Sequence, residues 1–136
     1  EPTSGVEPLA RARLWDRIRT QADHGVGVLV TTHYMQEARQ CDRLLLMSDG
    51  RLVAQGSERD IVDGTRTLAV HAEDWARVFD VLSTAGMAVN LAGRDVRVID
   101  PDEEQLRAVL AQAGLDAAIT EVAPTIEERM TMLARR

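Results

Sequence analysis

The chain has 136 residues, of which 45% are hydrophobic and 28% are charged, and its formal net charge is -6. This length suffices for one compact domain or two small ones, and the negative charge disfavours nucleic acid and anionic lipid surfaces as partners. All 16 basic residues are arginines, which excludes every site that depends on a lysine, including the phosphate-gripping lysine of a P-loop.

The first elements predicted along the chain are a helix and a buried strand. Residues 8–24 predict an amphipathic helix that starts at Pro8 and ends before Gly25, because apolar residues recur at four-residue spacing, at Ala10, Leu14, Ile18 and Ala22. Residues 26–32 form a nearly continuous apolar, β-branched run, which is typical of a strand buried on both faces of a parallel sheet. His33 then falls at the carboxyl end of this strand, where open α/β sheets gather their ligands.

A short helix, a hairpin and a second short helix are predicted next. The helix covers residues 35–40, and the apolar segments 43–47 and 51–55 flank Asp49-Gly50, a tight-turn signal that predicts a β-hairpin. Ser57 and Asp60 have the spacing of a capping box, which predicts a helix that stops near Gly64. We place a domain boundary there, at residue 64 or 65.

The remainder of the chain predicts a second, smaller α+β domain, residues 65–136. Strands are expected at 67–72, 87–92, 96–99 and 117–122, and helices at 74–84 and 102–113. This order is that of a split βαβ, ferredoxin-like unit. The spacing of Thr125 and Glu128 after Pro124 predicts a capping box that opens a closing helix.

Several segments resemble a known family. The N-terminal stretch Glu1-Pro2-Thr3-Ser4-Gly5-Val6-Glu7-Pro8 resembles the segment that directly follows the Walker B strand in ABC ATPases, and Thr31-Thr32-His33 resembles the family's switch-histidine strand. The resemblance continues through 34–38, 41–43, the Gly50-Arg51 hairpin and Gly56, so that it covers residues 1 to about 63. The closing segment 124–128 is similar to the tail of drug-export ATP-binding subunits of the daunorubicin-resistance type.

The resemblance implies roles for particular residues. Phosphoryl transfer to water needs a carboxylate that orients the water and a donor that senses the γ-phosphate; by resemblance these are Glu1 and His33. Ser4, Gly5, Val6 and Glu7 match the D-loop, which crosses the dimer interface toward the partner's nucleotide. The family's usual residue at the last of these positions is Asp, and Glu7 departs from it.

The chain lacks other parts of the machinery that the family uses. With no lysine there is no Gly-rich loop ending in Gly-Lys-Ser/Thr, and neither the signature motif nor the aspartate that would precede Glu1 is present. ATP and Mg²⁺ are therefore expected as cofactors of the full-length protein and not of this chain alone, for which we expect no ATPase activity. With one cysteine, Cys41, and three scattered histidines we expect no metal site of its own.

The resemblance implies a C-terminal portion of an α/β ATPase core, residues 1–64, with the ferredoxin-like unit appended. The expected partners are a second ATP-binding subunit, as a homodimer, and a transmembrane permease that exports a drug or lipid. The expected location is the cytoplasmic face of the membrane without insertion, since no apolar run approaches the roughly 20 residues of a membrane-spanning helix.

Two other functions stay open. In one, residues 65–136 act as a regulatory or dimerisation module without catalysis. In the other, an independent hydrolase uses Glu1 and His33, although neither a nucleophile elbow nor a metal motif accompanies them. Apolar sheet surface left without the upstream strands also predicts a dimer or larger species.

Overall fold

The computed structural model describes residues 5–134. Within this range the chain is α/β, with six helices and two antiparallel sheets. It divides into two compact units, Glu1–Gln40 and Cys41–Arg136, which are described separately below. None of the helices in the described range is both long enough and apolar enough to cross a bilayer.

The first unit contains helix α1 (Pro8–Asp23) and the single-turn helix α2 (Met35–Ala38). Pro8 occupies the start of α1, where its missing N–H costs nothing because that group has no intrahelical partner. Gly25 ends the helix in a left-handed conformation, with φ of 85°, and its N–H donates to the Ala22 carbonyl at 2.8 Å. The helix predicted over residues 8–24 is confirmed.

The strand predicted over residues 26–32 is wrong for this structure, in which the segment has no regular secondary structure. Its side chains are open to solvent, with exposed fractions of 48% for Val26, 44% for Val28 and 87% for Leu29. A strand exists only where a neighbouring strand accepts and donates its backbone hydrogen bonds. No strand occurs elsewhere in the described part of this unit, so the apolar pattern has no ladder to join.

The second unit begins with the hairpin of β1 (Leu44–Ser48) and β2 (Arg51–Gly56). Asp49 and Gly50 both have positive φ, 50° and 74°, as the predicted two-residue turn requires. Helix α3 (Glu58–Val62) follows, and its Ser57–Asp60 capping box is confirmed. Gly56 is required there because its φ is 141° and an added Cβ would lie 2.7 Å from the Asp60 Cβ.

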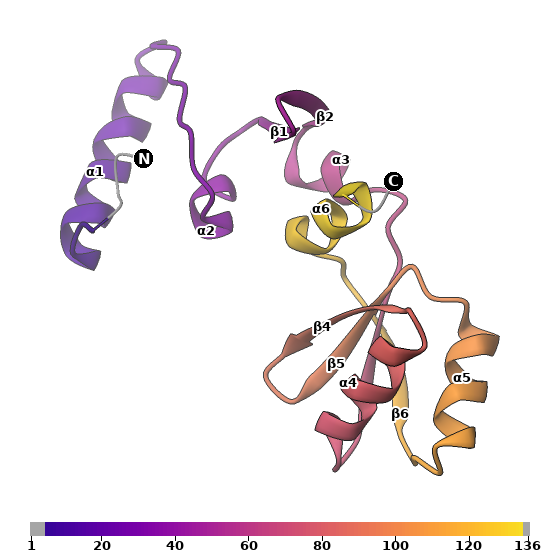
Figure 1. The fold of residues 1–136 in the computed structure, drawn as a ribbon. Helices are drawn as coiled ribbons and strands as arrows, with labels where there is room; N and C mark the ends of the chain where they lie inside the picture. The colour runs from indigo at the N-terminus through magenta and orange to yellow at the C-terminus, as the bar shows by residue number, and fades with distance from the viewer. Residues whose placement is uncertain (1–4, 135–136) are drawn as a thin grey trace. The chain divides into compact units, whose positions relative to one another are not determined.

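A four-stranded antiparallel sheet forms the body of the second unit (Figure 1). Its strands are β3 (Thr67–His71), β4 (Ala88–Ala92), β5 (Asp95–Ile99) and β6 (Ala118–Val122), in the spatial order β4-β5-β3-β6. Helix α4 (Trp75–Thr84) joins β3 to β4, and helix α5 (Glu103–Gln112) joins β5 to β6. These elements follow one another in the order predicted from the sequence.

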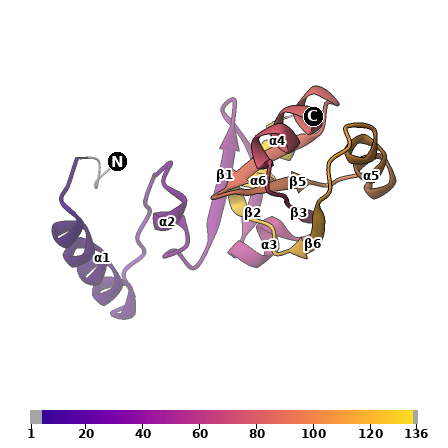
Figure 2. The ribbon, with the colours of Figure 1, turned by 90° about the horizontal axis from the view of Figure 1, so that it is seen from below.

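Helices α4 and α5 pack against each other and against one face of this sheet (Figure 2). Alternate residues of the two central strands point to that face, as the period of a strand dictates. The resulting core contains two residues from each of β3, β5, α4 and α5: Leu68, Val70, Val96, Val98, Val78, Leu82, Leu106 and Leu110.

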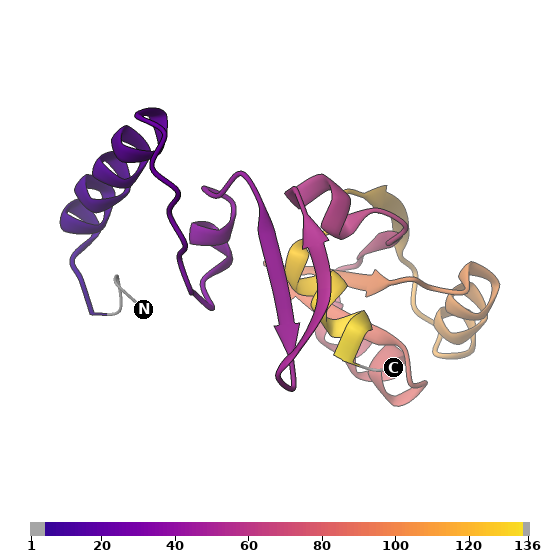
Figure 3. The same ribbon diagram turned by 90° about the horizontal axis from the view of Figure 1, so that it is seen from above.

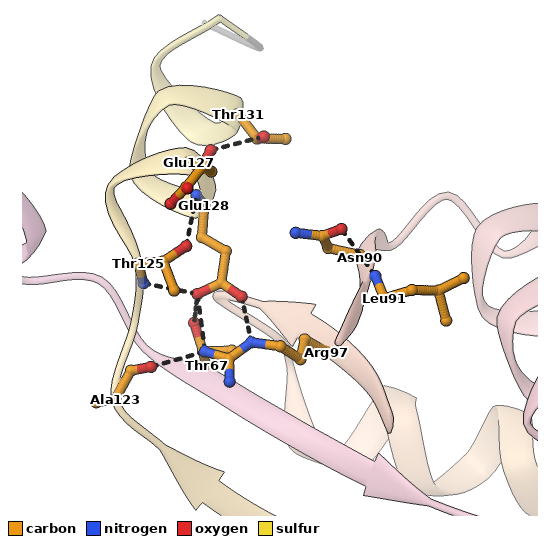
Figure 4. A network of polar contacts seen from close by, with 9 residues as sticks. All are labelled: Thr67, Asn90, Leu91, Arg97, Ala123, Thr125, Glu127, Glu128 and Thr131. Carbon is orange, nitrogen blue, oxygen red and sulfur yellow. Dashed lines mark hydrogen bonds and ion pairs between the residues drawn. The ribbon is translucent and has the colours of Figure 1, made fainter. Parts of the chain in front are cut away.

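Helix α6 (Ile126–Ala134) is fastened to β3 and β5 by a polar network (Figure 4). It also packs against α3 (Figure 3). Glu128, which is fully buried, accepts hydrogen bonds from Arg97 Nε at 2.5 Å and from Thr67 Oγ1 at 3.1 Å. The predicted capping box is confirmed, since Glu128 also accepts from the Thr125 N–H while its own N–H donates to Thr125 Oγ1.

The charge state of Glu128 follows from these contacts. Burial by itself raises the pKa of Glu128, but the hydrogen bond from Arg97, the backbone N–H of Thr125 and the Arg97 charge outweigh it, so the net pKa lies below its ordinary value. The same pair raises the pKa of Arg97. A carboxyl with a lowered folded-state pKa stabilises the fold above its unfolded pKa, and this contribution disappears as pH falls through the folded value.

We expect Glu128→Gln to lower the stability of the second unit at pH 7 by about 2–4 kcal/mol, because it leaves Arg97, 14% exposed, without its counter-ion. The variant should also lose part of the decline in stability below about pH 4.3, the ordinary glutamate pKa. Urea unfolding at pH 7 and pH 3 in a Trp15→Phe background, followed by the fluorescence of Trp75, measures both effects. Glu127→Gln, at the exposed neighbouring position, is the matched control; equal pH dependence in the two variants would contradict the assignment.

Candidate functional site

The residues predicted as the D-loop, 4–7, directly precede Pro8, the first residue of α1, in the sequence. Glu1 and Ser4 fall outside the described residues, whereas Gly5, Val6 and Glu7 are described. Glu7 is the N-cap residue of α1, and its carbonyl accepts a hydrogen bond from the Arg11 N–H at 2.9 Å. The Glu7 side chain makes no capping bond, so its carboxylate contributes to the helix terminus only through its charge.

His33 lies at a bend between the irregular segment 26–32 and helix α2. Its side chain is exposed, and its ring lies 4.1 Å from the ring of Tyr34, centroid to centroid, with the planes tilted by 36°. The Glu7 carbonyl thus contacts α1, and the His33 ring lies against that of Tyr34.

Thr32 and Glu37 fix the bend at His33. The Thr32 hydroxyl donates to Glu37 Oε2 at 2.7 Å and accepts from the Tyr34 N–H at 3.0 Å. Glu37 is only 2% exposed although it is a carboxylate. A buried carboxylate is tolerated only where donors compensate its lost hydration, so this pair restricts the backbone on either side of His33.

Arg11 brings a positive charge to the same cluster. Its Nε lies 3.9 Å from Glu37 Oε1, and its guanidinium carbon lies 5.8 Å from the centre of the Tyr34 ring. This distance to the ring suits a cation–π contact. The local sequence pattern does not assign a role to Arg11, Thr32 or Glu37, because the packing that buries Glu37 is not visible in it.

A shallow cavity of about 280 Å³ lies along α1, lined among others by Arg11, Trp15, Arg19 and Gln40. Trp15 is 3% exposed, and its indole N–H has no hydrogen-bond partner among the described residues. Arg19 donates to Gln40 Oε1 at 2.7 Å. His33 and Glu7 do not line this cavity.

The described residues do not form a complete site for ATP and Mg²⁺. No three carboxylate, histidine or cysteine side chains converge as metal ligands in the described range. The cation that would grip a phosphate is also absent from the sequence, which has no lysine. What this part of the chain supplies is an oriented histidine at a bend, which can donate a hydrogen bond to a ligand held by other residues.

A second polar cluster crosses the sheet of the other unit. His71 Nδ1 lies 2.7 Å from Asp95 Oδ1, and its Nε2 lies 2.9 Å from Thr120 Oγ1. The hydroxyl of Thr120, the imidazole of His71 and the carboxylate of Asp95 are thus linked in the same order as the catalytic triads of hydrolases. The His71 side chain is 40% exposed, however, and neither described cavity includes it, so this geometry is explained by cross-strand bridging.

The chain is similar to ATP-binding proteins of export systems. It is 35% identical over 114 residues to Nod factor export ATP-binding protein I of Burkholderia lata, covering 81% of this chain and 38% of that protein. It is 32% identical over 141 residues to the protein of the same name from Rhizobium etli, covering 100% of this chain and 44% of that protein. These matches support a fragment of an ABC transporter ATP-binding subunit.

Two further results limit this assignment. The chain spans less than half the length of these relatives, 38% and 44%, and no family model matches it. The relatives carry the name of Nod factor export and do not support the predicted daunorubicin-resistance type in particular. Multidrug efflux and antibiotic resistance are likewise unsupported by these names.

We expect Thr32→Val and Glu37→Gln each to destabilise the first unit by about 1–3 kcal/mol: the first removes a donor to a carboxylate that is 2% exposed, and the second removes the charge that strengthens this bond and faces Arg11. The double variant should cost less than the sum, since one bond joins the two residues. Denaturation followed by Trp15 fluorescence in a Trp75→Phe background measures this unit. Thr31→Val, at an exposed position, is the control, and additive effects of the two substitutions would contradict the coupling.

Glu7→Asp should stabilise α1 by about 0.5–1 kcal/mol, because the shorter carboxylate can accept from the free N–H groups of the first turn, whereas Glu7 makes no such bond. The helical circular dichroism signal and the Trp15 unfolding midpoint both report the change. Glu7→Gln removes the charge at constant length and should lower stability slightly. An equal midpoint for the Asp variant and the parent chain would show that the N-cap geometry does not admit this bond.

Proposed function

We propose that this chain is the C-terminal part of an ATP-binding subunit that couples ATP hydrolysis to export through a membrane partner. The match over 100% of the chain to an export ATP-binding protein carries the proposal. The bend at His33, held by the bond from Thr32 to Glu37 at 2.7 Å, supports it, because a phosphate-sensing donor must be held in a fixed position to act.

In this proposal Glu1 orients the attacking water and His33 donates a hydrogen bond to the γ-phosphate. Gly5, Val6 and Glu7, with Ser4, approach the nucleotide of a second subunit. ATP and Mg²⁺ are held by upstream parts of the full-length protein, and they supply the phosphoryl group and the charge neutralisation. Thr32 and Glu37 act by positioning His33.

We further propose that residues 1–64 belong to the ATPase core and that residues 65–136 form an appended ferredoxin-like domain. The strand order β4-β5-β3-β6, with antiparallel neighbours and two helices on one face, supports the second part. The other face carries Thr67 and Arg97, which bind Glu128 of α6, so the outer edge of β6 is what such a domain leaves available for regulation or dimerisation. A role confined to that regulatory domain is the alternative function.

The proposed partners are a second copy of the ATP-binding subunit and a transmembrane permease, with the subunit on the cytoplasmic face of the membrane. The relatives are named for the export of Nod factor. For this protein we propose a drug or a lipid as the exported compound, and its identity is to be set by the permease.

ATP binding tests this function directly. Calorimetry with and without Mg²⁺ should detect no binding to the 136-residue chain, and should detect binding to a chain extended upstream to the length of the relatives. In the extended chain His33→Ala should lower kcat roughly 10²–10³-fold, the usual loss for a donor to transition-state charge.

His24→Ala is the matched control, because His24 is an exposed histidine of the same unit whose Nδ1 contacts the Thr20 carbonyl at 2.6 Å. It should leave kcat within about twofold, as expected for an exposed position away from the chemistry. Tight ATP binding by the 136-residue chain, or equal activities of the two alanine variants, would overturn the proposed assignment.

A further inference from the structure

The two edges of the four-stranded sheet differ. In the described residues β6 pairs only with β3, and β4 pairs only with β5, so each presents one row of backbone groups outward (Figure 1). On β4, the Leu91 N–H is already occupied, because it donates to Asn90 Oδ1 at 2.7 Å. Strand β4 also lies against helices α4 and α6. These features leave β6 as the more accessible edge.

Strand β6 carries few of the devices that normally protect an edge. Its sequence, Ala118–Val122, has no proline or lysine and a single charge, on Glu121. That charge is neutralised within the chain, because Arg66 Nε lies 3.1 Å from Glu121 Oε2. Thr120 is held by His71 at 2.9 Å, which orders the side chain on one face of the strand.

The sequence of β6 is suited to pairing with itself. An antiparallel pair of two β6 strands centred on Ile119 places Ile119 opposite Ile119, Ala118 opposite Thr120, and Ala117 opposite Glu121. Ile119 is half-buried and packs at the margin of the core formed with α4 and α5. The pairing would therefore join the two apolar cores, and it keeps the two Glu121 carboxylates several residues apart.

We propose that β6 is a homodimerisation edge, on which two copies of this chain pair antiparallel around Ile119 to form one continuous eight-stranded sheet. This inference deepens the dimerisation role proposed for residues 65–136. The β6 dimer requires neither ATP nor His33. The crosslinking experiment below can therefore fail while the ATPase proposal holds, and the reverse is also true.

Cysteine crosslinking tests the register. In a Cys41→Ser background, which removes the only native cysteine, Ile119→Cys places two thiols directly opposite each other. Such pairs have Cα atoms about 4.5–5.5 Å apart, within the range of a disulfide. Oxidation with diamide should convert most of this variant to a covalent dimer.

Val89→Cys in the same background is the matched control. Val89 is also half-buried, β-branched and packed at the margin of the same core, but it lies on β4. We expect at least tenfold slower crosslinking of this variant. Equal rates for the two cysteines, or no crosslink at Ile119, would overturn the proposed register.

A pair of lysine variants tests the edge without cysteines. Ala118→Lys and Ala92→Lys add the same charge at exposed alanines on β6 and β4. Lysine blocks edge pairing, and in a symmetric dimer each substitution acts twice, so Ala118→Lys should raise the dimer dissociation constant roughly tenfold. Sedimentation equilibrium measures both variants; a monomeric parent chain, or equal dissociation constants for the two variants, would disprove the edge.

Discussion

The ion pair between Arg97 and Glu128 is the interaction on which the second unit depends most. Burying a carboxylate costs several kcal/mol unless donors surround it, and Glu128 is fully buried. Its oxygens accept from Arg97, Thr67 and the Thr125 N–H, so one side chain joins β5, β3 and the first turn of α6. The position of α6 is therefore set by directional polar contacts together with the burial of Ile126.

The sequence predicted those features that depend on neighbours in the chain. The capping boxes at Ser57 and Thr125, the turn at Asp49-Gly50 and the end of α1 at Gly25 each arise from residues a few positions apart. Glu128 was correctly predicted as a capping residue. The ion pair that Glu128 makes with Arg97 was not predicted, because the two residues are 31 positions apart and only the fold brings α6 next to β5.

The strand prediction at residues 26–32 is wrong because a strand depends on contacts outside its own segment. An apolar, β-branched pattern favours a strand, but a strand also requires a partner that the described part of the first unit does not contain. The same limit applies to the site. His33 could be identified from its motif, whereas Thr32 and Glu37, which hold its bend, become visible only once the burial of Glu37 is known.

The positions of charge and hydrogen-bonding capacity explain why the two proposed roles fall in different parts of the chain. The first unit has a buried carboxylate, Glu37, whose bond from Thr32 holds the bend at the exposed His33, which suits the proposed phosphate-sensing role. In the second unit, the charge on β6 is already balanced by Arg66, so a net charge of -6 need not oppose association at that edge. At physiological ionic strength the Debye length is about 8 Å, so charges farther than this from β6 are largely screened and repulsion at the edge depends mainly on the charges close to it. Pairing through β6 is therefore compatible with an acidic chain.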